Sequence, residues 1–136
     1  MALIAEHASR EFGVAVTSRS AGSPFPAPNS MAHEILMVIR EAVYNAVLHG
    51  KPVHIWIEFT YGPEELEVTV RDDGSGFDPG TSPGDGQPHY GITGMQERVR
   101  SLNGRIEWIS ARGQGTTVRF AIRRSALFPS KEKVED

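Results

Sequence analysis

Two alternating segments around a tight turn limit most strongly how this chain can fold. From Val53 to Phe59, apolar residues alternate with polar or amphipathic ones, and the alternation resumes from Leu66 to Val70. Between them lies Tyr61-Gly62-Pro63-Glu64, a sequence typical of turns. Period-two alternation on both sides of such a turn predicts a β-hairpin with one buried face. Another layer of structure must therefore cover that face.

A helix is predicted before the hairpin. Asn29 or Ser30 can cap its first turn, in which Glu34 is favourable, and Gly50-Lys51-Pro52 ends it near His49. Its apolar residues recur at helical spacing and form a core-facing stripe: Ile35, Leu36, Ile39, Ala42, Val43, Ala46 and Val47.

Further elements are predicted on both sides of the hairpin. They are a short helix over residues 2–11, an edge strand over 12–18, a proline-rich connector over 21–28, a helix over 91–103, and a second hairpin formed by 105–110 and 116–122. The segment 77–90 is rich in Gly and Pro and has no periodicity, which is typical of a lid loop. This order predicts an α+β fold, a two-layer α/β sandwich with helices packed on one face of a mixed, mostly antiparallel sheet.

Composition restricts the domain organisation and the class of protein. At 136 residues and 39% hydrophobic, the chain can build one core but not two. We expect a domain over 12–124, preceded by the tail of a helix or linker (1–11) and followed by a flexible tail (125–136). A net charge of −3 without a Lys/Arg run argues against nucleic acid, and the lack of cysteine excludes thiolate metal sites. Without an apolar run of about 18 residues, a cytoplasmic location is expected, although a larger parent could be tethered to a membrane.

Three polar residues lie along one face of the first long helix. Glu41, Asn45 and His49 are spaced by four and should stack on one another. The amide oxygen of Asn45 suits a hard cation such as Mg²⁺, and Glu41 could accept a proton from an attacking group. For three polar residues alone, an ordinary solvated face is the better interpretation.

The hairpin is followed by Asp72-Asp73-Gly74-Ser75-Gly76. Asp and Gly are common in turns, so a turn alone would explain this segment. The functional interpretation is that Asp72 accepts a hydrogen bond from an exocyclic amine such as that of adenine, while Gly74 and Gly76 let the base approach the backbone. Asp73 is the alternative acceptor, but the D-x-G-x-G phase favours Asp72.

Two further glycine-containing segments are candidates. Gly91-Ile92-Thr93-Gly94-Met95 opens a predicted helix, where unpaired N–H groups can bind phosphates. Because G-x-x-G is common, a flexible helix entry explains it as well. In Gly113-Gln114-Gly115-Thr116-Thr117, a turn before a β-branched strand is sufficient, and a hydroxyl of Thr116 contacting the base is the alternative. The chain lacks the G-x-x-x-x-G-K-[ST] and G-x-G-x-x-G phosphate motifs and the G-x-S-x-G hydrolase motif.

In combination and in this order, these segments resemble the ATP-binding catalytic domain of two-component sensor histidine kinases, within the gyrase-type (Bergerat) ATPase superfamily. The likeness includes an asparagine box from Glu41 to Gly50 and a first glycine box from Asp72 to Phe77. A second glycine box runs from Gly91 to Met95 and continues as Gln96-Glu97-Arg98-Val99, and a Gly-x-Gly-Thr precedes the last strand. The most similar subtype is the one that signals to regulators with helix-turn-helix outputs.

The resemblance implies ATP and Mg²⁺ as cofactors and a role for each matching residue. Asn45 would hold Mg²⁺, and Glu41 would help to activate the phosphoacceptor. Asp72 would bind the adenine amine, and His49 would border the ribose and base. The remaining ATP-binding residues implied are Gly74, Gly76, Phe77, Gly91, Ile92, Thr93, Gly94, Met95 and Thr116, under a lid over 77–90. The implied reaction is transfer of the ATP γ-phosphoryl group to a histidine, mainly by positioning and charge neutralisation.

The chain departs from the family pattern in two respects. Leu48 stands where many relatives carry Lys or Arg, so one phosphate contact is missing. The phosphoacceptor histidine of the family lies on an upstream dimeric helical hairpin, and His7 lacks the sequence around that histidine. We therefore expect a monomeric domain whose partner is its own dimerisation domain, outside this chain, with a response regulator as an indirect partner and no nucleic acid.

Two other functions are compatible with the same fold. A serine kinase of the anti-sigma-factor type has about this size, but Gly94-Met95-Gln96-Glu97-Arg98-Val99 and Gly104-Arg105-Ile106-Glu107 are more similar to sensor kinases. A module that binds nucleotide or a partner protein without catalysis is the second. The joint presence of Glu41, Asn45 and Asp72 argues against it.

Overall fold

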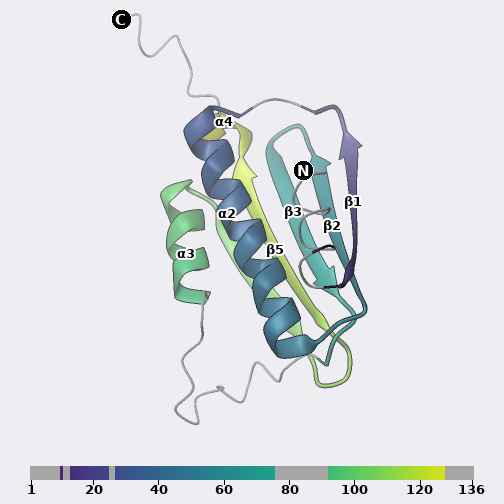
Figure 1. Cartoon of the computed structure of the whole chain (residues 1–136). Helices are drawn as coiled ribbons and strands as arrows, with labels where there is room; N and C mark the ends of the chain where they lie inside the picture. The colour runs from purple at the N-terminus through teal and green to yellow at the C-terminus, as the bar shows by residue number, and fades with distance from the viewer. Residues whose placement is uncertain (1–9, 11–12, 25–26, 76–91, 128–136) are drawn as a thin grey trace, which may run out of the picture.

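A computed structural model describes residues 10, 13–24, 27–75 and 92–127. Its five strands form one sheet in the order β1-β2-β3-β5-β4 (Figure 1). The elements along the chain are β1 (Ala15–Gly22), α2 (Asn29–Asn45), a π-helical turn η1 (Ala46–Gly50), β2 (His54–Tyr61), β3 (Glu65–Asp72), α3 (Ile92–Ser101), β4 (Arg105–Ser110), β5 (Thr116–Arg123) and α4 (Arg124–Leu127).

The predicted hairpin is confirmed as β2 and β3. These strands pair antiparallel, with Ile55 opposite Asp72 and Tyr61 opposite Leu66. In the turn, the backbone N–H of Gly62 donates to the carbonyl of Glu65 at 2.9 Å. The apolar members of the alternation are buried and the intervening residues are more exposed, as period-two patterning requires.

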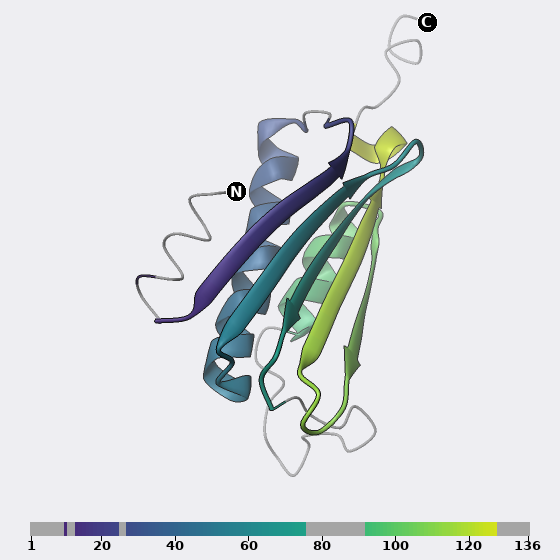
Figure 2. The same ribbon diagram turned by 90° about the vertical axis from the view of Figure 1, so that its right-hand side faces the viewer.

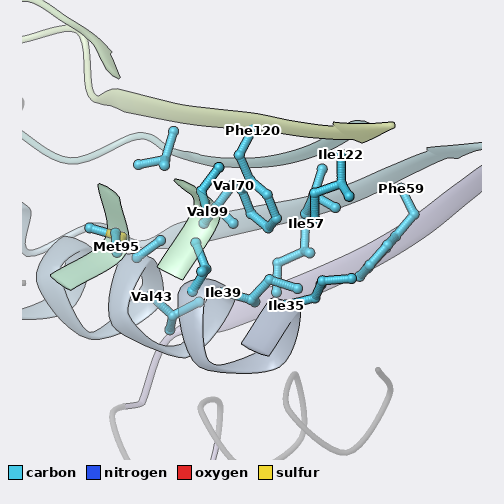
Figure 3. Close-up of a cluster of buried hydrophobic side chains, with 14 of the residues drawn as sticks. Ile35, Ile39, Val43, Ile57, Phe59, Val70, Met95, Val99, Phe120 and Ile122 are labelled. Atoms are coloured by element: carbon cyan, nitrogen blue, oxygen red, sulfur yellow. The ribbon is translucent and has the colours of Figure 1, made fainter. Parts of the chain in front are cut away.

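The predicted two-layer α+β sandwich is also confirmed. Helices α2 and α3 cover one face of the sheet, and no helix of the described residues covers the other face (Figure 2). The β1–β2 pair is parallel and the other pairs are antiparallel, so the sheet is mixed. The core between the layers, part of which is drawn in Figure 3, includes Ile35, Ile39, Val43, Met95 and Val99 from the helices and Ile57, Phe59, Val70, Phe120 and Ile122 from the sheet.

The chain directions bring the functional segments together at one end of the domain. Helices α2 and α3 run antiparallel, so the end of α2 lies near the beginning of α3 (Figure 1). The end of β3 and the β4–β5 turn lie at the same end, whereas the β2–β3 turn and α4 lie at the opposite end (Figure 1). One end of the sheet therefore carries the end of α2, the segment after β3 and the β4–β5 turn.

The start of α2 differs from the prediction. The helix begins at Asn29, Pro28 occupies the capping position, and no side chain caps the first turn. The prediction that Asn29 or Ser30 caps the helix was therefore wrong, as was the placement of Glu34 in the first turn. Pro28 has φ −55° and ψ 146°, and its carbonyl accepts a hydrogen bond from Ala32 at 2.8 Å. A proline before the helix fixes the entry of the chain without a side-chain cap.

The first strand and the last helix also correct the predicted boundaries. Strand β1 covers Ala15–Gly22 and not 12–18, because it pairs with the full length of β2. After β5, the chain forms the short helix α4, and Leu127 is fully buried in the core. The flexible tail predicted from residue 125 is therefore wrong for the first residues of that segment. Most of the predicted helix over 2–11 and the predicted lid over 77–90 lie outside the described residues. No helix among the described ranges is long and apolar enough to cross a membrane.

Candidate functional site

Backbone hydrogen bonds through Ser75 join three segments at the end of the sheet. The N–H of Ser75 donates to the carbonyl of Gly50 at 2.9 Å, at the end of η1. The carbonyl of Ser75 accepts from the N–H of Gly113 at 2.6 Å, in the β4–β5 turn, and its Oγ donates to the carbonyl of His49 at 3.4 Å. The segment after β3 is therefore held between the first long helix and the last hairpin.

Asp72 is the central polar residue of this junction. Its relative exposure is 5%, and among the described residues it is the charged side chain that is buried. Its Oδ1 accepts the N–H of Gly74 at 2.7 Å, and the backbone N–H of Thr116 faces the carboxylate and lowers its pKa. Burial nevertheless raises the pKa of Asp72, and the adjacent Asp73 raises it further. A buried carboxylate whose described contacts include no cation is a strong candidate for a ligand-binding group.

The neighbouring Asp73 has a different role. Its Oδ1 accepts the N–H groups of Val53 at 2.9 Å and His54 at 3.0 Å, at the beginning of β2. The hydrogen bond from His54, followed by that from Val53, lowers the pKa of Asp73. Asp73 therefore connects the end of β3 to the start of β2. Its engagement there favours Asp72 as the ligand-binding carboxylate.

We expect Asp73→Asn to lower the free energy of unfolding by about 0.5–1 kcal/mol at pH 7, because the carboxylate accepts two backbone N–H groups. The loss is small because the side chain is exposed and solvent partly screens both hydrogen bonds. A lowered pKa in the folded state means that the stabilisation is present above the unfolded pKa of about 3.9 and is lost as the pH falls through the folded value. Urea unfolding at pH 7 and pH 3 measures the difference in free energy of unfolding between wild type and variant. An equal difference at both pH values would contradict the assignment.

The close approach of another backbone segment requires a glycine at position 74. A Cβ at Gly74 would lie 2.5 Å from the carbonyl oxygen of Gly50 and 2.9 Å from Oδ1 of Asp72. The sequence predicted a glycine that leaves room for a ligand, and the structure shows one that leaves room for η1. A side chain here would push η1 away from Asp72.

The helix face predicted from the spacing of four is only partly regular. Glu41 and Asn45 lie one turn apart on α2 and are both partly buried. His49 lies on η1, where the backbone is π-helical and not α-helical, and it is exposed. The regular α-helical spacing expected for all three residues therefore ends at Asn45, before His49. π-helical turns inside helices occur frequently at functional sites, and here the turn brings the carbonyl of Gly50 to Ser75.

The beginning of α3 presents small, exposed residues next to a core residue. Thr93 and Gly94 are exposed, and Met95 is fully buried among core side chains (Figure 3). Met95, which the resemblance places among the ATP-binding residues, therefore directs its side chain into the core. Gly76, Phe77, Gly91 and the side chain of Ile92 lie outside the described residues. In the described ranges, no three His, Cys, Asp or Glu side chains form a metal-binding group.

Thr116 supports Asp72 through its backbone. Its N–H faces the Asp72 carboxylate and lowers the pKa of that group, while its Oγ1 lies 2.8 Å from the Oγ of Ser110. Ser110 also donates to the carbonyl of Gly115 at 3.1 Å. The sequence pointed to the Thr116 hydroxyl as a ligand contact and missed Ser110 and Ser75. Ser110 could have been found from the hairpin register, which places it opposite Thr116.

Comparisons with known proteins agree with this arrangement. A family described as histidine kinase-, DNA gyrase B-, and HSP90-like ATPase matches residues 32–126. The sensor histidine kinase YdfH of Bacillus subtilis is 34% identical over 92 residues, covering 67% of this chain and 22% of YdfH. The nitrate/nitrite sensor protein NarQ of Escherichia coli is 33% identical over 94 residues, covering 68% of this chain and 16% of NarQ. The chain thus spans less than a quarter of the length of these relatives.

The fold matches a solved structure. The blue-light activated histidine kinase EL346 of Erythrobacter litoralis superposes with a TM-score of 0.70 at 22% identity, covering 98% of this chain and 42% of that one. The matched family covers the long helix, both hairpins and the junction around Asp72. The chain belongs to the histidine kinase-, DNA gyrase B- and HSP90-like ATPase family, as an ATPase domain of the sensor histidine kinase type.

Proposed function

We propose that this domain binds ATP and donates its γ-phosphoryl group to a histidine on a dimerisation domain outside this chain. The observation that carries the proposal is the buried carboxylate of Asp72, held by the N–H of Gly74 and facing the N–H of Thr116 at the junction of three motifs. A fixed acceptor in a site of low polarity suits the exocyclic amine of adenine, because the ligand supplies a donor that the protein does not.

The same proposal assigns the triphosphate to the neighbouring helix ends. Asn45 offers a partly buried amide oxygen near the end of α2, and Mg²⁺ uses few protein ligands besides phosphate oxygens and water. Bound there, Mg²⁺ would neutralise charge on the phosphates. The backbone N–H groups from Gly91 to Met95 would face the phosphates, as unpaired donors at the beginning of a helix do.

The remaining residues would complete the pocket. Glu41, one turn before Asn45, would orient and activate the accepting histidine, and His49 would border the ribose. Gly74, Gly76, Phe77 and Thr116 would frame the base. We propose that the domain is monomeric and cytoplasmic, and that a response regulator receives the phosphoryl group from the histidine.

We expect Asn45→Ala to remove the effect of Mg²⁺ on nucleotide affinity. For wild type, Mg²⁺ should tighten ATP binding by roughly tenfold, since the ion links the amide oxygen to the phosphates. Calorimetric titration with ATP, in Mg²⁺ and in EDTA, measures the ratio for each variant. Asn29→Ala at the other end of α2, where the side chain makes no capping hydrogen bond, is the matched control. Persistence of the Mg²⁺ effect in Asn45→Ala would show that Asn45 is not a ligand.

The reaction itself is tested with separate acceptors. The chain is incubated with γ-labelled ATP and Mg²⁺, together with the dimerisation domain of its parent protein. The proposal expects label on that domain that is lost in acid and kept in base, as for phosphohistidine. Acid-stable label on the serine of an added antagonist protein would instead identify the anti-sigma-factor type of kinase. ATP binding without transfer to either acceptor would identify a non-catalytic module.

A further inference from the structure

An ion pair connects the two helices that carry the proposed metal and phosphate contacts. The Nη1 of Arg98 on α3 donates to the Oε1 of Glu34 on α2 at 2.8 Å. The side chains of Arg98 and Glu34 are 35% and 30% exposed, so about two thirds of each is shielded from water. Other ion pairs of the described chain, such as Arg105–Glu65, lie on the sheet.

The remaining described contacts between α3 and α2 are mainly apolar. Met95 and Val99 of α3 are fully buried and lie near Val43 and Ile39 of α2 (Figure 3). Apolar burial is not directional, so such contacts tolerate a small shift of one helix along the other. A guanidinium donating to a carboxylate has a defined geometry and restricts that shift. The Glu34–Arg98 pair therefore supplies a directional contact between the described parts of the two helices.

The ion pair lies in the half of each helix that is distant from Thr93 on α3 and from Asn45 on α2. Arg98 is five residues after Thr93, roughly 8 Å along the helix axis, and Glu34 is eleven residues before Asn45, roughly 17 Å. Because α2 and α3 run antiparallel, a contact between their distal halves sets the relative position of their functional ends (Figure 1). A short helix of ten residues transmits a displacement of its last turns to its first turn.

We propose that Glu34 and Arg98 are positioning residues that fix the position of the phosphate-binding end of α3 relative to Asn45 on α2. The inference rests on the proposed function, since it requires phosphates at the beginning of α3. The proposal gives the ion pair no role in adenine binding. The contacts of the Asp72 carboxylate come from Gly74 and Thr116, which belong to neither helix. Loss of the pair should therefore weaken binding of phosphate-bearing ligands and leave adenosine unaffected.

The test compares ADP with adenosine in Arg98→Gln and Glu34→Gln, by calorimetry for ADP with Mg²⁺ and by NMR titration for adenosine. Each variant should weaken ADP binding by roughly tenfold and change adenosine binding by less than about twofold. The charge-swapped double variant Glu34→Arg/Arg98→Glu should recover most of the lost ADP affinity. Arg105→Gln is the matched control, because it removes a bidentate pair of 2.9 and 3.0 Å at the opposite end of the sheet, and it should change neither affinity.

Three results would overturn the inference. Unchanged ADP affinity in both single variants would show that the pair does not position α3. Equal weakening of ADP and adenosine would show a general loss of structure, and no recovery in the swapped variant would show that the attraction between the two charges is not responsible. Should Arg98→Gln fail to fold, Glu34→Gln supports the same comparison. If the wild-type protein bound neither ligand, the proposed function itself would be overturned. That outcome is distinguishable from failure of the inference, because it is seen without any variant.

Discussion

Asp72→Asn should weaken binding of ADP and ATP by about a hundredfold. The buried carboxylate is held by the N–H of Gly74 and faces the N–H of Thr116, so it cannot turn away when its charge is removed. The substitution replaces a charge-assisted acceptor with an amide whose NH₂ group can face the amine of adenine. Losing such a hydrogen bond and leaving a donor unpaired costs about 2–3 kcal/mol, which corresponds to this change in affinity.

The same variant should keep or increase the stability of the ligand-free fold. The pKa of Asp72 is raised in the folded state, chiefly by burial. A raised carboxyl pKa contributes stability below the unfolded pKa, and this contribution is lost as the pH rises through the folded pKa. The ionised form of the side chain therefore opposes folding, whereas asparagine is neutral and can still accept the N–H of Gly74. Thermal unfolding at pH 7 should give a Tm for Asp72→Asn no lower than that of wild type.

Asp73→Asn is the matched control for this prediction. It removes the adjacent charge, but its hydrogen bonds reach Val53 and His54 and not the ligand. It should lower stability and leave nucleotide affinity within about twofold of wild type. The opposite pattern, in which Asp73→Asn loses affinity and Asp72→Asn retains it, would reverse the assignment of the two carboxylates.

The sequence was most informative where local pattern and tertiary structure agree. The alternation around Tyr61-Gly62-Pro63-Glu64 predicted β2 and β3, because every second residue of both strands faces the helices. The order of elements predicted the layers, since helices between hairpins can cover only a shared face. The phase of D-x-G-x-G favoured Asp72 over Asp73, and the hydrogen bonds of Asp73 to β2 supply a physical reason.

The sequence was least informative where long-range contacts determine the local conformation. The π-helical turn that contains His49 coincides with the contact between Gly50 and Ser75, residues that are far apart in the chain. The full extent of β1 follows from parallel pairing with β2, and the burial of Leu127 follows from a core built by earlier elements. Met95 belongs both to the glycine-rich motif and to the apolar stripe of α3, and the structure shows that its side chain packs in the core.

Gly115 provides the second large effect, on stability. It has φ +76°, and a Cβ there would overlap the carbonyl oxygen of Asp72 and lie 3.2 Å from the Cα of Asp73. Both neighbours are backbone, so they can move only if the ends of β3 and β5 separate. We expect Gly115→Ala to lower the free energy of unfolding by about 3 kcal/mol, from the strained backbone and the displaced strands together.

Gly113→Ala separates these two contributions. Gly113 lies two residues away in the same turn and has nearly the same backbone angle, φ +77°, but a Cβ there would have nothing within 4 Å. Its substitution should cost only the strain of the left-handed conformation, about 1 kcal/mol. Urea unfolding of both variants measures the difference, which reports the overlap with Asp72 alone. Equal losses in the two variants would mean that the strand ends accommodate the methyl group without separating.

The pair of glycine variants also connects stability to the binding site. Separation of the strand ends moves the N–H of Thr116 away from the Asp72 carboxylate, which then loses the favourable electrostatic effect of that group. Folded Gly115→Ala should therefore bind ADP roughly tenfold more weakly than wild type, measured by calorimetry at a temperature where both are folded. Gly113→Ala should retain its affinity, because its side chain would project into open space. If Gly115→Ala binds ADP as wild type does, the backbone of the last hairpin does not hold Asp72 in place for the ligand.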